Sequence, residues 1–399
     1  MVLASRRPLR LGLVAACAFP APRGSQVFID ESARALEAAG AEVHLVAPRG
    51  RERDSVPYRI HGLWPLPRLR PRLALAGASL LARPLFDVAL ALRLERVARA
   101  ERLDVLLAHN YEGLAVALAV RTRTGIPVVY QAHNVAEDEL PWLGGASLGP
   151  GLGSLGRVLD RQLPRRADAV VALSDDVAAH LVACGVAPER MHVIAPGLDP
   201  RPFVGWRRRR RKLRVIFAGN LDAYQNMTGL LEAWEWVVAG LPAAELHIVI
   251  HRGEARRARM LAERPGVRVV TAHALQDVAR ELGAAAVGVS PRQSWSGYPI
   301  KILNYMAAAL PTVAMARAAK GVVAGSTGWV AADESTAALG AVLLEALLSP
   351  AECRRRGEAA ARRLDRDHAW SRQSSRLLGV VEAVVAGEPR RSLPVAVGA

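Results

Sequence analysis

Two histidines follow short apolar runs, at points where a side chain can reach a ligand. His109 comes directly after the run 105–108, and His133 comes shortly after the run 128–131. If these runs are parallel strands, both rings lie at carboxyl ends, the edge at which open α/β sheets bind ligands. An imidazole there can donate a hydrogen bond or move a proton near neutral pH. The alternative is that each ring only satisfies hydrogen bonds at a strand end. We favour a functional role for His133 and leave both interpretations open for His109.

A second group of polar residues lies around position 300. A helix predicted over 301–309 carries Lys301 and Asn304 one turn apart, so both side chains project from the same face. Lys301 stands near the amino end of this helix, where backbone N–H groups and the helix dipole attract anions. Arg292, in the preceding loop, is a second cation. These residue types suit an anionic ligand such as a diphosphate, with a solvated Lys301 as the alternative.

The first half of the chain alternates short apolar runs with helical stretches, a pattern typical of parallel α/β sheets. A helix predicted over 25–39 ends at Gly40, and another over 175–184 stops at Gly185. The expected strands are 11–16, 43–46, 105–108, 128–131, 169–173 and 192–194.

The alternation breaks near position 197 and then resumes. A turn-rich stretch leads into the basic run 207–212, whose like charges should keep it solvated. After it, the expected strands are 214–218, 245–250, 267–271, 284–290 and 312–316, with helices at 226–239, 252–262 and 301–309. We therefore predict two doubly wound, Rossmann-like domains facing each other across a cleft. They are an N-terminal domain 1–198, a basic linker 199–212 and a C-terminal domain 213–369.

The composition limits the classes of partner and compartment. Of 399 residues, 53 are Lys or Arg and 37 are Asp or Glu, giving a formal net charge of +16. This surplus favours anionic partners such as nucleotide phosphates, anionic lipid or nucleic acid, or reflects an arginine-rich composition alone. The cysteines, Cys17, Cys184 and Cys353, are far apart and form no CxxC pair. Neither a disulfide framework nor a zinc site is expected, which fits a reducing compartment.

The amino terminus has two interpretations. Basic residues at 6–10 followed by the apolar run 11–19 resemble a signal peptide. The segments 25–39 and 43–46 would, however, complete a βαβ unit that begins with this run, so we favour a buried first strand. No run of 18 or more apolar residues occurs, so no transmembrane helix is expected.

The segment 66–103 interrupts the regular pattern. It mixes Leu, Ala, Phe and Val with many arginines and predicts one or two basic amphipathic helices. These are either ordinary surface helices, which we favour, or helices that lie on anionic lipid.

Motifs in the first half resemble the GT-B glycosyltransferases often called group 1 or family 4. The loop 19–25 before the first helix resembles the family's glycine-bearing loop, although 40–43 reads Gly-Ala-Glu-Val where the family has G-H-x-V. The resemblance implies that Arg23 and Gly24 lie near the donor phosphate and the acceptor. It also implies that His133, in the motif 128–134, works near the anomeric carbon, and it places His109 in the motif 104–110. The stretches 167–174 and 193–199 resemble the end of the family's N-terminal domain and indicate fold.

Motifs in the second half resemble the family's donor-binding domain. Asn220 and Asn226 stand where many members carry Arg and Lys on the donor diphosphate. The stretch 290–314 resembles the donor-site element, with Ser296 and Asn304 where many members carry two glutamates. The resemblance implies that Asn304 binds ribose and that Lys301 and Arg292 stabilise the leaving diphosphate. It further implies that a final helix, about 370–388, packs back on the N-terminal domain.

The resemblance implies a hexosyltransferase-type enzyme. It would move a sugar from a nucleotide-sugar donor to a glycan or lipid-linked acceptor, with retention of anomeric configuration. No metal-ligand cluster is visible in the sequence, so we expect no metal dependence and no cofactor beyond the donor. A cytoplasmic protein, peripheral at the inner membrane face through 66–103, would suit a membrane-anchored acceptor.

Other functions remain open. The uncharged residues at 220, 226, 296 and 304 also fit a catalytically degenerate GT-B protein that serves as a scaffold at membrane or nucleic acid. Nucleic acid is the less expected partner, because the basic run 207–212 has only Trp206 as an aromatic neighbour. A sugar-nucleotide epimerase is a weaker alternative. A dinucleotide-dependent oxidoreductase is disfavoured, since no GxGxxG follows the first strand.

Overall fold

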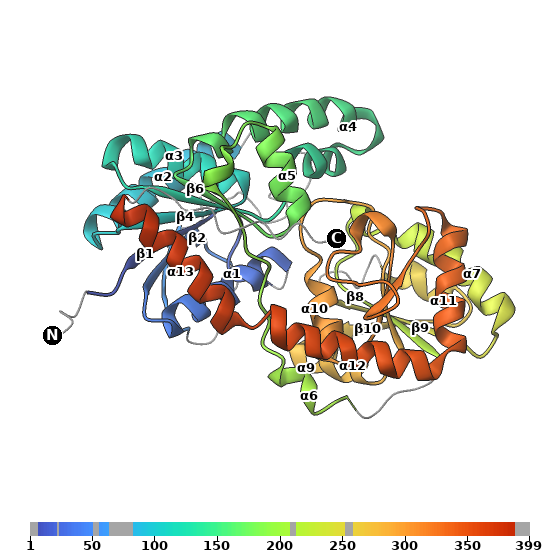
Figure 1. Cartoon of the computed structure of the whole chain (residues 1–399). Helices are drawn as coiled ribbons and strands as arrows, with labels where there is room; N and C mark the ends of the chain where they lie inside the picture. The colour runs from blue at the N-terminus through green and yellow to red at the C-terminus, as the bar shows by residue number, and fades with distance from the viewer. Residues whose placement is uncertain are drawn as a thin grey trace. The chain divides into compact units, whose positions relative to one another are not determined.

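The computed structural model describes residues 7–21, 24–50, 56–63, 83–207, 213–251 and 258–387. These residues form two compact α/β units (Figure 1). The first unit holds the chain up to Gly197, the short loop Ser296–Tyr298 and everything from Trp370 onward. The second unit holds Leu198–Trp295 and Pro299–Ala369.

The first unit is built on a seven-stranded parallel sheet in the order β3-β2-β1-β4-β5-β6-β7. Its strands are β1 (Arg10–Ala15), β2 (Glu42–Pro48), β3 (Arg59–Leu63), β4 (Val105–His109), β5 (Val128–Ala132), β6 (Ala169–Ala172) and β7 (Met191–Val193). The central strands are almost entirely buried along their length. Helices therefore cover both faces, which explains why these strands are continuous apolar runs without polar alternation.

The helices of the first unit form two layers. They are α1 (Gly24–Ala38), α2 (Arg83–Ala100), α3 (Asn110–Thr124), α4 (Ala136–Gln162), α5 (Asp175–Ala183) and α13 (Trp370–Ala386). The last helix packs beside the first, α13 on α1, and α2 packs beside α3 (Figure 1). Trp370 anchors α13 by donating from Nε1 to Glu31 at 2.9 Å and by packing its ring, tilted by 44°, against Phe28.

The second unit has a six-stranded parallel sheet in the order β10-β9-β8-β11-β12-β13. Its strands are β8 (Arg214–Ala218), β9 (Glu245–His251), β10 (Val267–Ala272), β11 (Val287–Ser290), β12 (Thr312–Ala314) and β13 (Gly328–Val330). Its helices are α6 (Arg201–Val204), α7 (Met227–Gly240), α9 (Leu275–Gly283), α10 (Ile300–Ala307), α11 (Thr336–Leu348) and α12 (Pro350–Asp367). The core around Phe217, Trp234 and Trp329 belongs to this sheet and to helices α7 and α11.

Several predicted elements differ from the observed ones. The edge strand β3 was not predicted, because its residues are only partly buried and show no apolar run. The predicted strand 284–290 begins only at Val287, since Ala284 still donates its N–H to the last turn of α9. The predicted strand 312–316 ends at Ala314, and a 3₁₀ turn follows.

Two predicted segments fall partly outside the described residues. Of the helix 252–262, residues 252–257 are outside, and Arg259–Glu263 forms a 3₁₀ helix. Of the linker 199–212, residues 208–212 are outside, and α6 lies within the described part.

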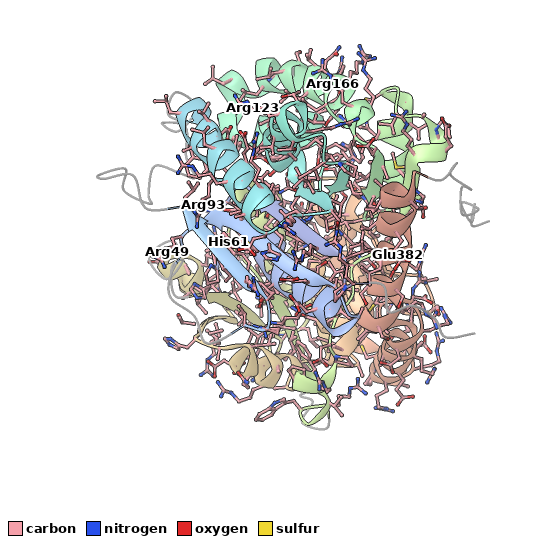
Figure 2. All side chains as sticks on the ribbon, turned by 90° about the vertical axis from the view of Figure 1, so that its left-hand side faces the viewer. Arg49, His61, Arg93, Arg123, Arg166 and Glu382 are labelled. Atoms are coloured by element: carbon pink, nitrogen blue, oxygen red, sulfur yellow. The ribbon has the colours of Figure 1, made fainter. Side chains whose placement is uncertain are left out.

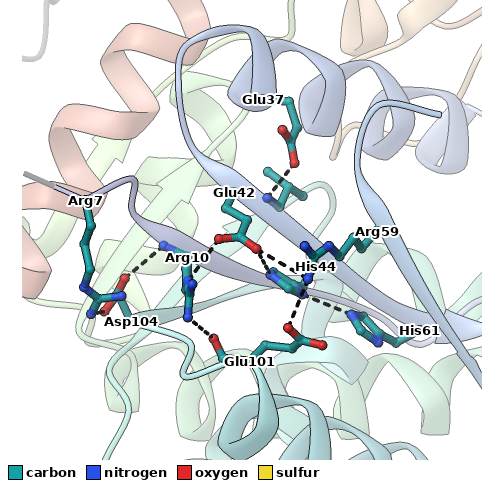
Figure 3. Close-up of polar contacts among 10 residues, drawn as sticks. Arg7, Arg10, Glu37, Glu42, His44, Arg59, His61, Glu101 and Asp104 are labelled. Carbon is teal, nitrogen blue, oxygen red and sulfur yellow. Dashed lines mark hydrogen bonds and ion pairs between the residues drawn. The ribbon is translucent and has the colours of Figure 1, made fainter.

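Charged side chains tie together the amino ends of the strands in the first unit (Figure 3). Arg10 at the start of β1 donates from Nε to Glu42 Oε2 at 3.0 Å, and Arg59 at the start of β3 pairs with Glu101 at 3.1 Å. These charged groups therefore form ion pairs with one another at the amino edge of the sheet. The two histidines singled out in the sequence follow the opposite, carboxyl edge.

Helix α2 covers part of the segment 66–103, of which 66–82 lies outside the described residues. Its inner face packs on α3 and β2, as in an ordinary surface helix. The buried apolar side chains of this face are Leu90, Leu94 and Val97. Figure 2 shows Arg93 of this helix beside His61 of β3.

Within the described residues, no single helix is both long enough and apolar enough to cross a bilayer. A bent pair, Thr336–Leu348 with Pro350–Ala386, meets the criterion only in combination, across a bend of 100°. Apolar side chains of its first helix, such as Leu339 and Leu343, are buried in the core of the second unit.

Candidate functional site

His109 and His133 meet at the carboxyl edge of the first sheet. His109 is the last residue of β4, and His133 follows the end of β5, so the pairing of these parallel strands brings the two rings together. His109 Nδ1 and His133 Nε2 are 3.0 Å apart. Phe28 of α1 lies edge-on to the His133 ring, with centroids 4.8 Å apart.

Burial keeps this histidine pair neutral. It lowers the pKa of His133 to about 3, and burial with the neighbouring His133 lowers the pKa of His109 well below its ordinary value. A neutral imidazole carries one N–H, so one ring donates and the other accepts across the 3.0 Å contact. Nε2 of His109 is buried and has no hydrogen-bond partner among the described groups. An unsatisfied buried nitrogen of this kind is a feature that a bound substrate can explain.

The loop Ser296–Tyr298 packs within the first unit at the start of α4. Ser296 donates to Asp138 Oδ2 from its backbone N–H at 3.0 Å and from its hydroxyl at 2.7 Å. Gly297 has φ of 74°, and a β-carbon there would lie 1.9 Å from Asn134 Oδ1. Glycine is therefore required at this position. The hydroxyl of Ser296, which belongs to the stretch that resembles the donor-site element, is hydrogen-bonded to Asp138 in this structure.

Two buried cations lie at the carboxyl edge of the second sheet. Lys301, in the first turn of α10, donates from Nζ to Gln225 Oε1 at 2.5 Å and stands 3.9 Å from the centre of the Phe217 ring. Arg292 donates to Ser294 and lies 5.1 Å from the centre of the Tyr224 ring. Burial and the nearby Arg292 lower the pKa of Lys301 well below its ordinary value. Within the described residues, Lys301 forms no ion pair with a carboxylate.

A polar network joins Lys301 to Asn220. Gln225 accepts from Lys301 and donates to Asn220 Oδ1 at 3.0 Å. Asn220 in turn donates to Asp222 at 2.6 Å and to the hydroxyl of Tyr224 at 3.3 Å. Sequence reasoning missed Gln225 and Tyr224, although their place just after β8, at its carboxyl end, could have indicated them.

A cavity of about 420 Å³ opens beside this network. Its lining includes Leu221, Asp222, Asn226, Thr228 and Gln293. Asn226 has φ of 54° and caps α7, accepting from the backbone N–H of Gly229 at 3.2 Å. The volume falls within the range of small-molecule sites. Asn226 therefore lines a ligand-sized cavity and also has a structural role.

The remaining predicted residues take part in none of the contacts described above. Asn304 is half-buried on α10, one turn after Lys301. Gly24 is the exposed first residue of α1, and among the described residues no atom beyond its own neighbours lies within 4 Å of where its β-carbon would stand. Arg23 lies outside the described residues.

Two family models match the chain. Residues 22–201 match Glycosyltransferase Family 4, and residues 212–349 match Glycosyl transferases group 1. The chain belongs to the group 1, family 4-like glycosyltransferases. Its two parallel-sheet units are the halves of the GT-B fold, as predicted from the sequence.

This glycosyltransferase is similar in sequence to the MMP α-(1→4)-mannosyltransferase of Mycolicibacterium hassiacum. The two are 27% identical over an alignment of 319 residues, and the match covers 74% of each chain.

Solved structures share the fold of this glycosyltransferase. Sucrose-phosphate synthase from Thermosynechococcus elongatus superposes with a TM-score of 0.79 at 17% identity, covering 95% of this chain and 100% of that one. HepE of Anabaena, in complex with UDP and glucose, has a TM-score of 0.68 at 14% identity, covering 94% and 100%. At these low sequence identities, the similarity to the solved structures shows a shared fold and no more.

Proposed function

We propose that this glycosyltransferase moves a hexosyl residue from a nucleoside-diphosphate sugar to a glycan or lipid-linked acceptor. The donor binds the second unit and the acceptor binds mainly the first. The reaction retains anomeric configuration and needs no metal. The observation that carries the proposal is the pair of buried cations, Lys301 and Arg292, at the carboxyl edge of the second sheet.

A leaving diphosphate suits these cations. Two positive charges that are buried near each other are costly without an anion, as the lowered pKa of Lys301 indicates. A bound diphosphate compensates that cost and is stabilised by preorganised donors as negative charge develops on it. Binding should therefore raise the pKa of Lys301, and affinity should fall as pH rises. Asn304 is proposed to hold the ribose, with Asn220 and Asn226 contributing to the donor site.

The histidine pair suits the reacting end of the sugar. With its pKa at about 3, His133 is neutral at physiological pH and acts by hydrogen bonding, not as a cation. Gly24 and Arg23 are proposed to border the phosphate and the acceptor. The open space around Gly24 is compatible with the close approach of a ligand.

The relatives support transfer of a sugar from a nucleotide-sugar donor, but they do not identify the donor of this chain. HepE was solved with UDP-glucose, and the curated relative is named as a mannosyltransferase. A nucleotide-sugar donor is therefore the reasonable class for this chain.

The membrane role proposed for 66–103 rests on the outer face of α2. Its exposed apolar side chains recur at helical spacing, followed by exposed arginines on the same face. These residues are Leu85, Val88, Leu92, Arg96 and Arg99. An apolar stripe flanked by cations fits the surface of an anionic bilayer. We accordingly propose a cytoplasmic protein that is peripheral at the inner membrane face.

The test is calorimetric titration of the purified protein with UDP, GDP, ADP and TDP, with and without Mg²⁺. We expect saturable binding of one diphosphate, unchanged by Mg²⁺. The change Lys301→Ala should weaken binding by at least an order of magnitude, the scale of one charge-assisted contact. The matched control is Lys320→Ala, another lysine of the same unit.

Two outcomes would contradict the proposal. Binding that is equally tight in Lys301→Ala would remove this lysine from the donor site. No binding of any diphosphate by the folded protein would favour the catalytically degenerate scaffold. Salt-sensitive binding of nucleic acid would then be the next property to measure.

A further inference from the structure

Three metal-ligating side chains converge in the first unit, away from the groups used above, and a cysteine lies beside one of them. His180 lies on α5, and its Nε2 is 3.2 Å from Asp160 Oδ2 and 3.7 Å from Glu137 Oε2. The Sγ of Cys184, directly after α5, is 3.5 Å from the same nitrogen. The ligating atoms of His180, Asp160 and Glu137 all lie within 4.8 Å of one another.

These separations fit a tetrahedral metal. Zinc binds nitrogen and oxygen at about 2.0–2.1 Å and sulfur at about 2.3 Å, which places ligand N and O roughly 3.3 Å apart and N and S roughly 3.5 Å apart. The three distances from His180 Nε2 lie close to these values. Imidazole, thiolate and carboxylate together are a donor set that favours zinc over magnesium or calcium.

The fold positions three of these side chains. His180 and Cys184 are four residues apart at the end of α5, so they share one helix face. Asp160, near the end of α4, is almost fully buried and accepts from the backbone N–H groups of Ala136 and Glu137 at 2.9 Å each. These hydrogen bonds hold the carboxylate in place, as second-shell contacts do for metal ligands.

The local charges allow a cation. Glu137 and Asp160 supply two negative charges, and the Cys184 thiolate would supply a third. Arg157 pairs with Glu137 at 2.6 Å and offsets part of this charge. Burial and the two carboxylates raise the pKa of the Cys184 thiol, so binding of a metal would release one proton from it to solvent.

We propose that Glu137, Asp160, His180 and Cys184 form a site for one divalent transition metal of the zinc type. The metal would tie the start and end of α4 to α5. Because α4 begins three residues after His133, the site would hold the helix that follows the histidine pair. Its role is structural and does not enter the sugar transfer proposed above. The spacing of the cysteines does not indicate it, since only one cysteine takes part.

A second group of histidines and carboxylates in this unit is less suited to a metal. His44 and His61 approach to 3.0 Å near Glu101 (Figure 3). There, however, Glu101 pairs with Arg59, and Glu42 beside His44 is held by Arg10. These arginines neutralise the carboxylates of that group, whereas in the proposed site Asp160 pairs with no arginine among the described residues.

The test uses Co²⁺ as a spectroscopic substitute for zinc. The full-length protein is stripped with a chelator, dialysed and titrated with CoCl₂. We expect one Co²⁺ per chain, intense visible bands of tetrahedral cobalt, and a near-ultraviolet thiolate-to-cobalt charge-transfer band. Zn²⁺ should displace the cobalt and raise the thermal midpoint of the stripped protein.

Matched variants identify the ligands. Cys184→Ser should abolish the charge-transfer band, whereas Cys17→Ser, a change of the other half-buried cysteine, should retain it. His180→Ala should weaken binding at least tenfold, with folding checked by circular dichroism. A folded wild-type protein without the charge-transfer band, or a band that survives Cys184→Ser, would overturn the proposal. Diphosphate binding is measured separately, so failure of either proposal leaves the other testable.

Discussion

At the scale of single residues, the histidine pair is where burial most clearly changes chemistry. His109 and His133 are enclosed by the sheet and by Phe28, and each has a lowered pKa. Neutral rings at a carboxyl edge can position a substrate through hydrogen bonds without adding charge. The same burial should lower the stability of the folded protein in acid, because it opposes protonation of the rings.

His133 should make the protein acid-sensitive. Its pKa of about 3 when folded lies below the ordinary value of about 6.5, so below pH 6.5 only the unfolded chain takes up this proton. The contribution to stability is present above pH 6.5 and is lost as the pH falls toward 3. Between pH 7 and pH 5 the loss should be about 2 kcal/mol.

Denaturant unfolding at pH 7 and pH 5 tests this prediction. His133→Gln should lose less stability over this interval than the wild type. His273→Gln, which alters an exposed histidine, is the control and should behave as the wild type does. Parallel losses in His133→Gln and wild type would contradict the prediction.

At the scale of secondary-structure elements, the amino end of α7 combines stability with ligand binding. Asn226 caps the helix, adopts positive φ and lines the cavity. Few residues meet both backbone demands, because the cap needs a side-chain oxygen and the left-handed conformation penalises a β-carbon.

Substitutions at Asn226 should separate these roles. Asn226→Ala loses the cap and strains the backbone, at a cost of about 2 kcal/mol, and Asn226→Gly should cost less because it relieves the strain. Asn226→Asp keeps the cap oxygen but adds a negative charge beside the cavity. It should fold as stably as the wild type yet bind diphosphate more weakly. Equal diphosphate affinity in the Asp variant would place Asn226 outside the donor site.

Helix α2 should govern attachment to anionic lipid. Its exposed face carries Leu85, Val88 and Leu92. We expect co-sedimentation with vesicles rich in phosphatidylglycerol and little with phosphatidylcholine, weakened by added salt. Leu85→Ser with Leu92→Ser should reduce binding several-fold, whereas Leu348→Ser, at another exposed apolar residue, should not. Equal sedimentation of all variants would contradict the role of α2.

At the scale of the whole molecule, two separate cores predict two separable unfolding events. Leu107 is fully buried in the first unit and Leu343 in the second. Each change to alanine should remove about 2–5 kcal/mol from its own unit. In differential scanning calorimetry, the two variants should lower different components of the transition.

The cations and asparagines that are proposed to hold the donor lie in the second unit. The component of the transition that Leu343→Ala lowers is therefore the one that a diphosphate should stabilise. At a concentration of 100 times the dissociation constant, the stabilisation should be about 2.7 kcal/mol. Stabilisation of the other component would place the main diphosphate contacts in the first unit. A single transition shared by both variants would show that the units unfold together.

The sequence by itself determined the repeating elements. Strands buried on both faces must be continuous apolar runs, so β1, β4, β5 and β8 were predicted within a residue or so of their observed bounds. His109, His133 and Lys301 could be selected because strand ends and helix amino ends are local features. The edge strand β3 was missed, because partial burial leaves no such pattern.

Only the tertiary structure decided which side chains meet. Each crossover connection returns the chain to the same sheet edge, so residues distant in sequence become neighbours there. In this way His109 meets His133, and Lys301 meets Gln225. Asp160 likewise joins His180 through packing, since no spacing along the chain brings α4 and α5 together. Burial then set the charge states of the histidines and of Lys301, because the cost of holding a charge depends on the surrounding atoms and not on residue type.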